Sequence, residues 1–283
     1  MQHVVITGVS TGIGWGATKV LIERGFHVFG SVRKQADADR LSAEFGTNFT
    51  PLLFDVVDQA AVQKAADQVH AHLNGQTLSG LVNNAGIAVP GPLMHLAVDQ
   101  YRHQLEINLV GPLIVTQAFL PLLGAERGFK GTPGRIVNIS SVGGRVAAPF
   151  VGAYTASKHG LEGLSESWRR ELMIYGIDVI IVGPGSVATP IWDKANNEDI
   201  TPFEGTDYIK PLQKFRTYAT RSGKKGLASE RVGEVIWKAL SEPKPRVRYP
   251  IVPQHFFNWT LPMLLPRRMV DRFLASQFGL KRK

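Results

Sequence analysis

The stretch TGVSTGIG, residues 7–14, follows a short β-branched run, HVVIT at 3–7, and leads into a segment with helical spacing. Its glycines, Gly8, Gly12 and Gly14, therefore stand between a strand and a helix. A pyrophosphate needs a tight turn, backbone that it can approach closely, and free N–H groups at a helix N-terminus. A plain turn is the alternative, but directly after the first strand this loop predicts a dinucleotide-binding site.

Outward from this loop, strand-like and helix-like segments alternate along the chain. Further strands are expected at 27–32, 49–56, 78–86, 134–141, 177–185 and 246–252, and helices at 15–25, 36–46, 58–73, 99–123, 153–175 and 229–241. Short apolar strands that alternate with helices form a parallel sheet covered on both faces. The pattern predicts an α/β fold, a doubly wound parallel sheet with helices on both faces in a single domain.

The composition excludes several classes of protein. Among the 283 residues, 44% are hydrophobic and 19% charged, too apolar for a disordered chain. With no cysteine there is no disulfide, thiol catalysis or cysteine metal site, and the eight histidines lack ligand spacing, so no metal is predicted. No apolar run reaches the roughly 18 residues of a membrane span, and no secretory leader is evident. The expected location is cytoplasmic.

The net charge of +9 is concentrated at the C-terminus. Residues 244–283 hold nine Lys or Arg and one acid, Asp271, so they carry +8 and leave the first 243 residues near +1. Nucleic-acid binding by the domain would need a basic face on the domain itself. No nucleic-acid partner is predicted.

Two segments stand apart from the alternating pattern. Residues 190–228 are polar and irregular, which is typical of a lid or substrate-binding loop inside a catalytic domain spanning 1–253. Residues 254–283 form a basic amphipathic extension with two interpretations. The extension either packs on the domain and helps cover the substrate pocket, or makes a peripheral membrane contact with Phe257 and Trp259 at the interface.

The end of the second strand indicates the cofactor. NAD sites carry an acid there for the ribose 2′-hydroxyl, whereas a basic residue accommodates the 2′-phosphate of NADP. Here Val32 stands in place of the acid, and Arg33 and Lys34 follow. Two solvated surface cations are the alternative interpretation. The prediction is NADP(H), with NAD(H) as second choice.

Four motifs occur in a fixed order: TGVSTGIG, NNAG at 83–86, YTASK at 154–158 and PGSVAT at 184–189. With them the chain resembles the short-chain dehydrogenase/reductase family over about residues 1–250, and looks closest to its 17β-hydroxysteroid and retinol dehydrogenase-like branch. The resemblance implies a Rossmann-type sheet of seven parallel strands and NAD(P)-dependent interconversion of alcohols with ketones or aldehydes. It also implies a homodimer or homotetramer.

The resemblance assigns four catalytic residues. Tyr154 would be the acid/base and Lys158 its partner, Ser141 would hold the substrate oxygen, and Asn108 would hold a water. Taken singly, each has an ordinary interpretation: a packed aromatic, a solvated cation, a strand-end hydroxyl and a helix residue. For the cofactor, besides Arg33, the resemblance implies Gly8, Ser10, Thr11, Gly12, Ile13, Gly14, Asp55, Val56, Asn83, Ala85, Gly86, Tyr154, Lys158, Pro184, Gly185, Val187 and Thr189.

The spacing of Tyr154 and Lys158 suits proton transfer. A free tyrosine has a pKa of about 10, too high for a base near neutrality. A nearby ammonium favours the phenolate and lowers that pKa. Residues four apart lie on one helix face, so Lys158 is expected beside Tyr154 to lower its pKa.

The substrate side is mostly apolar, which favours a lipophilic alcohol or carbonyl substrate. The candidate contacts are Ser141, Val142, Gly143, Phe150, Val151, Tyr154, Pro184, Gly185, Ile191 and Trp192. These apolar residues could equally pack on the core. The alternative function is an NADP-binding sensor or scaffold without turnover, although both Tyr154 and Lys158 are retained.

Overall fold

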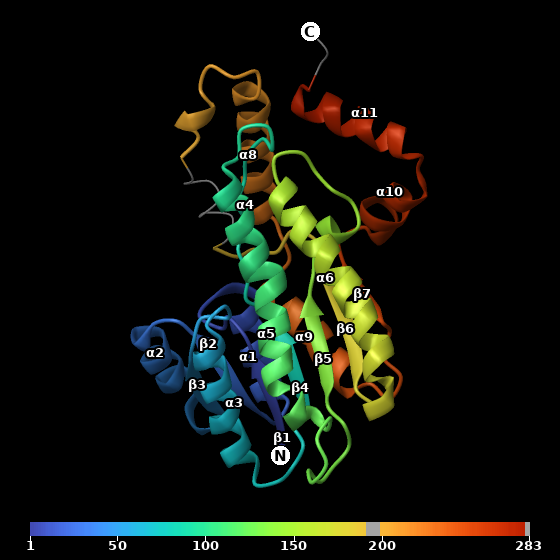
Figure 1. The fold of residues 1–283 in the computed structure, drawn as a ribbon. Helices are drawn as coiled ribbons and strands as arrows, with labels where there is room; N and C mark the ends of the chain where they lie inside the picture. The colour runs from blue at the N-terminus through green and yellow to red at the C-terminus, as the bar shows by residue number, and fades with distance from the viewer. Residues whose placement is uncertain (191–198, 281–283) are drawn as a thin grey trace.

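The computed structural model describes residues 1–190 and 199–280. Its centre is one sheet of seven strands in the order β3-β2-β1-β4-β5-β6-β7, in which every neighbouring pair is parallel (Figure 1). The strands are β1 (Gln2–Ile6), β2 (Phe26–Val32), β3 (Phe49–Leu53), β4 (Gly80–Asn83), β5 (Arg135–Ile139), β6 (Asp178–Pro184) and β7 (Arg248–Ile251). The predicted doubly wound sheet in a single domain is confirmed.

Helices cover both faces of the sheet because successive strand residues point to opposite sides. Val4 packs in one hydrophobic cluster and Val5 in the other, and the same alternation separates Val28 from Phe29. One face is covered by α1 (Gly12–Glu23), α2 (Gln35–Phe45) and α9 (Ser229–Ser241), the other by α3 (Gln59–Leu73), α5 (Gly111–Phe119) and α6 (Gly152–Glu171).

The strand order reverses between β1 and β4, the place where open α/β sheets bind ligands beyond the carboxyl ends of their strands. The glycine loop follows β1, the NNAG motif follows β4, and Ser141 follows β5. Motifs that lie far apart in the sequence are therefore brought to one edge of the sheet.

The predicted helix over 99–123 is divided into several elements. It consists of α4 (Val98–Leu105), a π-helical turn η2 (Glu106–Val110), α5 and a short 3₁₀ turn η3 (Pro121–Leu123). A π-helical turn inserts an extra residue into the helix and often marks a functional site. Here it carries Asn108.

The prediction that 190–228 is irregular is wrong for much of its length. The segment contains a 3₁₀ turn, η6 (Thr201–Phe203), and a 16-residue helix, α8 (Ile209–Lys224). Leu212 and Phe215 on α8 are buried. Ile209, Leu212, Phe215 and Ala219 recur every three to four residues, an amphipathic helical pattern that the sequence offered, whereas their packing partners come from distant parts of the chain.

The C-terminal extension packs on α8. After η7 (Phe256–Thr260) and α10 (Leu261–Leu264), helix α11 (Arg267–Phe278) buries Phe278 at 2% exposure. The rings of Phe278 and Phe215 are 5.4 Å apart between centroids. In Figure 1, α8 and α11 lie beyond the carboxyl ends of the strands. Within the described part of the chain, no helix has the length and apolar character needed to span a bilayer.

Candidate active site

The glycine loop is shaped for close approach of backbone. Gly8 and Gly12 have φ of +71° and +63°, in the left-handed region that glycine adopts without strain. A Cβ on Gly8 would lie 2.9 Å from Ala85 Cα, and one on Gly14 would press on the Gly8 carbonyl and lie 2.6 Å from Asn84 Nδ2. Side chains are thus excluded at positions 8 and 14, where the loop packs tightly on itself and on the end of β4, at the N-terminus of a helix that can bind an anion.

Thr7 and Asn84, which sequence reasoning missed, hold this loop against the end of β4. Thr7 Oγ1 accepts hydrogen bonds from the backbone N–H groups of Asn84 and Ala85, both at 2.9 Å. Asn84 Nδ2 donates to the carbonyls of Thr7 at 2.8 Å and Gly8 at 3.0 Å. The second asparagine of NNAG was the available signal.

Two of the predicted cofactor residues turn their side chains to the interior. Asn83 Nδ2 donates to Asn138 Oδ1 at 2.8 Å and Thr116 Oγ1 at 3.0 Å, which commits that side chain to the sheet and leaves its backbone to face a ligand. Val56 is 6% exposed and packs in the hydrophobic core. Local sequence cannot say which way a side chain at a strand end points, and cofactor contact by these two residues stays a prediction.

Arg33 and Asp55 lie side by side where β2 and β3 end. Arg33 Nη1 is 3.6 Å from Asp55 Oδ2, and the side chains are 66% and 37% exposed. An exposed ion pair of this kind is worth about 0–1 kcal/mol, so it gives way readily to a ligand. A second guanidinium, missed in the sequence, belongs to Arg40, whose Nη2 donates to the Ser10 carbonyl of the glycine loop at 2.7 Å.

The other predicted cofactor residues border the same loop. Ser10, Thr11 and Ile13 lie in the turn and the first residues of α1. Thr189 reaches the loop from beyond β6, because a Cβ on Gly12 would lie 3.2 Å from Thr189 Cγ2. Pro184, Gly185 and Val187 belong to the same β6 end.

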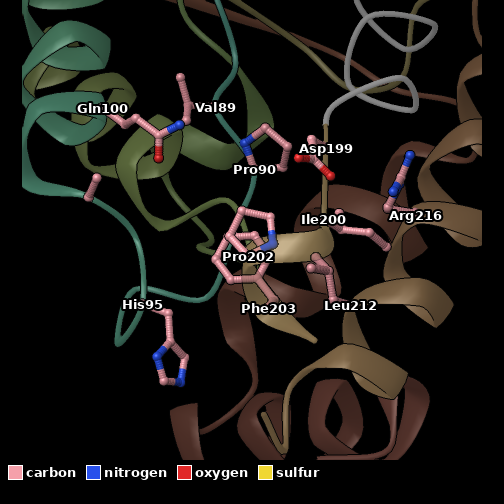
Figure 2. Close-up of a pocket in the computed structure, with 11 residues that line it drawn as sticks. Val89, Pro90, His95, Gln100, Asp199, Ile200, Pro202, Phe203, Leu212 and Arg216 are labelled. Atoms are coloured by element: carbon pink, nitrogen blue, oxygen red, sulfur yellow. The ribbon is translucent and has the colours of Figure 1, made fainter. Parts of the chain in front are cut away.

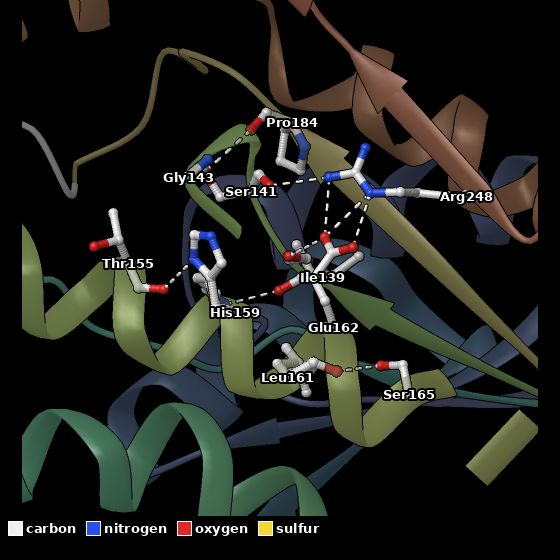
Figure 3. Close-up of polar contacts among 12 residues, drawn as sticks. Ile139, Ser141, Gly143, Thr155, His159, Leu161, Glu162, Ser165, Pro184 and Arg248 are labelled. Atoms are coloured by element: carbon white, nitrogen blue, oxygen red, sulfur yellow. Dashed lines mark hydrogen bonds and ion pairs between the residues drawn. The ribbon is translucent and has the colours of Figure 1, made fainter. Parts of the chain in front are cut away.

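Ser141, Tyr154 and Lys158 come together beside the end of β5. Tyr154 and Lys158 lie one turn apart on α6, with Lys158 Nζ 5.8 Å from the centre of the tyrosine ring. Lys158 Nζ donates to the Ile139 carbonyl at 2.8 Å. Ser141 accepts a hydrogen bond from the Gly143 N–H at 3.0 Å and donates one to the Pro184 carbonyl at 3.4 Å (Figure 3). A hydrogen bond between the side chains of Ser141 and Tyr154 acts to lower the pKa of the phenol.

Burial is the main influence on the two titratable groups. Burial raises the pKa of Tyr154, and its hydrogen bond with Ser141 opposes the rise. Burial lowers the pKa of Lys158 from 10.5 to about 8, and the Glu162 carboxylate opposes that shift. The direction is opposite to the lowering of the Tyr154 pKa that was expected from Lys158, because withdrawal of the phenol from water disfavours its charged form.

Asn108 is fixed by both ends of its amide and is 1% exposed. Its Oδ1 accepts from the Ile87 N–H at 2.9 Å, and its Nδ2 donates to the Ile87 carbonyl at 3.0 Å and to Ser157 Oγ at 3.1 Å. Ser157, inside the YTASK motif, was not singled out from the sequence. The water-holding role of Asn108 stays a prediction.

On the substrate side, Val142 and Gly143 form a 3₁₀ turn, η4 (Val142–Gly144), next to Ser141. Phe150 is buried with a φ of +66°. The predicted contacts Ile191 and Trp192 lie outside the described residues.

A cavity of about 370 Å³ opens between the loop after β4 and the segment that leads into α8 (Figure 2). Its lining is partly apolar, with polar side chains at the rim; among the described residues it comprises Val89, Pro90, His95, Ala97, Gln100, Asp199, Ile200, Pro202, Phe203, Leu212 and Arg216. None of the predicted substrate residues in the described chain lines it, although Phe150 packs in one cluster with Phe203 and Leu212.

The lowered pKa of Lys158 predicts a dependence of stability on pH. Between about pH 8 and pH 10 the unfolded chain holds a lysine proton that the folded chain has lost, so stability rises with pH. Relative to Lys158→Met, the free energy of unfolding of the wild type is expected to rise by up to about 1.4 kcal/mol per pH unit. Denaturant titrations of both proteins across this window measure the difference. If the free energy of unfolding depends on pH in the same way in the wild type and in Lys158→Met, Lys158 has an ordinary pKa.

Comparison with known proteins agrees with this site. A family model described as short chain dehydrogenase matches residues 2–200. An NADPH-dependent 3-dehydrocapnine reductase of Ornithobacterium rhinotracheale is 38% identical over 272 residues, which cover 96% of this chain and 95% of that protein. Retinol dehydrogenase 5 of Homo sapiens is 34% identical over 289 residues, which cover 96% of this chain and 87% of that protein.

The fold has a counterpart in a solved short-chain dehydrogenase from Streptomyces avermitilis, with a TM-score of 0.76, 26% sequence identity, and coverage of 99% of this chain and 98% of that one. The resemblance to the retinol dehydrogenase-like branch is supported by the human relative. Because the family model spans more than half of the chain and both relatives align over nearly all of it, this chain belongs to the short-chain dehydrogenase family.

Proposed function

We propose that this protein is an NADP(H)-dependent oxidoreductase that interconverts a lipophilic alcohol and its ketone or aldehyde, with Tyr154 as the acid/base. The observation that carries the proposal is the hydrogen-bonded pair of Ser141 and Tyr154, with Lys158 buried beside them at the edge of the sheet that bears the glycine loop.

The residues present fit an NADP molecule. Side chains are excluded from the loop at Gly8 and Gly14, so a pyrophosphate can approach the backbone and the N-terminus of α1. Arg33 extends from the end of β2 and would hold the 2′-phosphate, while Asp55 beside it would meet the adenine. When bound, the nicotinamide supplies or accepts the hydride.

The protein's own groups manage the proton. In reduction, Tyr154 Oη donates its proton to the carbonyl oxygen as negative charge develops there. A raised pKa keeps the phenol protonated and ready to donate at neutral pH. Ser141 Oγ would turn its single proton from the Pro184 carbonyl to the same substrate oxygen, and Lys158 would support the phenolate after transfer.

A lipophilic substrate is supported by the relatives and by the nearby cavity, whose lining residue Phe203 packs in one cluster with the predicted substrate contact Phe150. Ile200, Phe203 and Leu212 give the cavity an apolar side. One relative bears the name of a 3-dehydrocapnine reductase and another that of a retinol dehydrogenase. Reduction is the proposed direction, because the more similar of these two relatives is named as a reductase.

The test is consumption of NADPH, and in parallel NADH, with a panel of long-chain ketones and aldehydes that includes 3-dehydrocapnine and retinal. We expect turnover with NADPH on apolar members of the panel and none with short hydrophilic ketones. Tight NADPH binding without turnover on any member would contradict the proposal.

The cofactor choice predicts the effect of Arg33→Ala. Loss of a charge-assisted contact to the 2′-phosphate is expected to weaken NADPH binding about tenfold to a hundredfold. NADH lacks this phosphate, so its binding should not change. Fluorescence titration of both nucleotides measures the effect, and Arg102→Ala, an exposed arginine of α4, is the control. An equal loss of affinity for NADH and NADPH would show that Arg33 does not contact the 2′-phosphate.

We also propose that the C-terminal extension docks on an anionic lipid surface. Phe256, Phe257 and Phe273 are 55%, 63% and 67% exposed. On α11, Arg268 and Arg272 follow one helix face beside Phe273. Aromatic side chains next to cations suit the head-group region of a membrane with negative charge.

Vesicle co-sedimentation tests this docking. The wild type should bind vesicles that contain phosphatidylglycerol and bind phosphatidylcholine vesicles weakly. Each of Phe257→Ser and Phe273→Ser is expected to weaken binding about tenfold to a hundredfold, because a buried aromatic side chain is worth about 1.5–3 kcal/mol. Ile174→Ser, which removes an 80% exposed side chain elsewhere, is the control. If the wild type binds no vesicles but self-associates, and the two phenylalanine substitutions abolish this self-association, the surface binds a second copy of the chain instead.

A further inference from the structure

A buried ion pair lies directly behind the catalytic serine. Arg248 of β7 and Glu162 of α6 form a bidentate contact: Arg248 Nη2 is 2.9 Å from Glu162 Oε1, and Arg248 Nε is 3.0 Å from Glu162 Oε2 (Figure 3). Their side chains are 14% and 5% exposed. Neither residue has a role in the mechanism described above.

The pair holds the backbone of the strand end that carries the catalytic serine. Arg248 Nη2 also donates to the Ser141 carbonyl at 3.1 Å, and Ser140 Oγ donates to Glu162 Oε1 at 2.7 Å. The packing around the Glu162 carboxylate is tight, since a Cβ on Gly144 would lie 3.0 Å from Glu162 Oε1. Two consecutive residues are therefore held by one charged pair.

Stability alone does not account for this arrangement. Taking two charges out of water costs several kcal/mol per ion, and well-packed apolar residues often serve a fold equally well. Arg248 moreover keeps a buried Nη1 without a hydrogen-bond partner in the described structure. What apolar replacements could not do is donate to the Ser141 carbonyl and accept from Ser140.

We propose that Glu162 and Arg248 are positioning residues that hold the Ser140–Ser141 backbone so that Ser141 Oγ meets Tyr154 and the substrate oxygen. The effect on turnover rests on the proposed function of the site. The geometric part, the placement of Ser141 against Tyr154, concerns the protein without any substrate.

The pair also joins the C-terminal extension to the site. The guanidinium carbon of Arg248 lies 4.2 Å from the centre of the Trp259 ring in η7. Arginine stacks on aromatic faces as well as pairing with carboxylates. Trp259 thus covers the outer side of the pair. A displacement of the C-terminal extension would therefore move Arg248 and, through it, the Ser141 backbone.

Glu162 has a second consequence through Lys158. The charged and titratable groups around Lys158 are Tyr154 and Glu162 on its own helix, Arg248 from β7 through Glu162, and the exposed His159. Because the Glu162 carboxylate opposes the fall in the pKa of Lys158 that burial causes, its neutralisation lowers this pKa below about 8. Any limb of the rate profile that reports loss of the Lys158 proton then moves to lower pH.

The experiment compares Glu162→Gln, Arg248→Lys and their double variant in the full chain. A control pair exists in Arg24 and Glu234, in which Arg24 Nη2 alone donates to both carboxylate oxygens at 3.0 and 3.2 Å, and the guanidinium carbon of Arg24 lies 4.1 Å from the centre of the Trp237 ring. Glu234→Gln and Arg24→Lys remove an arginine–carboxylate pair stacked on a tryptophan at a more exposed place, between α1 and α9. The measurements are kcat, KM, the pH profile, thermal stability, and the carbon NMR signal of Tyr154 Cζ, assigned with Tyr154→Phe.

We expect kcat to fall about tenfold to a hundredfold in each Glu162 and Arg248 variant with a smaller change in KM, as for misplacement of a reacting group. The double variant should be little worse than either single one, because the two residues act as a unit. Glu162→Gln should also move the alkaline limb of the profile to lower pH. Trp259→Leu should give a weaker loss of kcat, and the control variants none.

The NMR signal tests the inference independently of turnover. In both single variants the Tyr154 Cζ signal should move toward its position in Ser141→Ala, whereas Glu234→Gln should leave it in place. An unmoved Tyr154 Cζ signal would overturn the inference, whether or not the wild type reduces a ketone. Absence of ketone reduction by the wild type would contradict only the proposed function. Loss of thermal stability with unchanged kcat and an unmoved signal would show that the pair serves the fold alone.

Discussion

Tyr154→Phe is expected to lower kcat for carbonyl reduction by about a thousandfold, because general acid catalysis contributes 10²- to 10⁴-fold. The change removes one oxygen atom and leaves the ring in place. The change removes the proposed proton donor, and Ser141 loses its contact with the phenol. The measurement is steady-state NADPH consumption with the best substrate of the panel.

The interpretation depends on the variant remaining folded and able to bind the cofactor. Binding of NADPH should change less than threefold, as the phosphate contacts come from the glycine loop and not from α6. Tyr175→Phe, at an exposed tyrosine that follows the same helix in η5 (Leu172–Tyr175), is the control for loss of a phenol. Retention of more than a tenth of wild-type kcat in Tyr154→Phe would assign the proton to another group.

Gly14→Ala is expected to abolish cofactor binding at any practical NADPH concentration. The new Cβ would press on the Gly8 carbonyl and lie 2.6 Å from Asn84 Nδ2, the two groups that join the loop to β4. The neighbour on one side is backbone, which cannot rotate away as a flexible side chain can. Overpacking of this kind costs about 1–3 kcal/mol, and here it displaces the surface on which a pyrophosphate would lie.

Gly163→Ala provides the matched comparison. Gly163 is also a helical glycine, on the exposed face of α6, and a Cβ there meets nothing within 4 Å. It should bind NADPH normally and gain about 0.5–1 kcal/mol of stability, since alanine favours a helix interior over glycine. Nucleotide titration and thermal unfolding measure both variants. Normal NADPH affinity in Gly14→Ala would show that the loop can move without loss of the site.

The fold was accessible from the sequence because its signals are local. Each strand of the sheet is a short apolar run, and each covering helix repeats its apolar residues at the spacing of a turn. The glycine loop and the YTASK motif are likewise local, since their residues lie within one turn of each other. Tyr154 and Lys158 share a helix face for that reason alone, and the structure places them as expected.

Helix α8 shows where local reasoning fails. Its surface is polar and its apolar residues are few, so the stretch reads as a loop. Phe215 becomes a core residue because Phe150 and Phe278, brought from other parts of the chain, lie at 5.8 and 5.4 Å from its ring. The amphipathic spacing of Ile209, Leu212, Phe215 and Ala219 was present in the sequence, but the sequence does not show which residues cover that apolar face.

What the sequence determined by itself is the order of strands and helices, the loop for a dinucleotide and the phenol–ammonium pair, because these depend on residues close together in the chain. Only the tertiary structure decided which way Asn83 points, how Asn84 joins the glycine loop, and that Arg248 reaches Glu162 across 86 positions. The pKa of Tyr154 belongs to the second group as well. Its direction is set by how far folding withdraws the phenol from water, and burial is a property of the packed chain and not of any stretch of it.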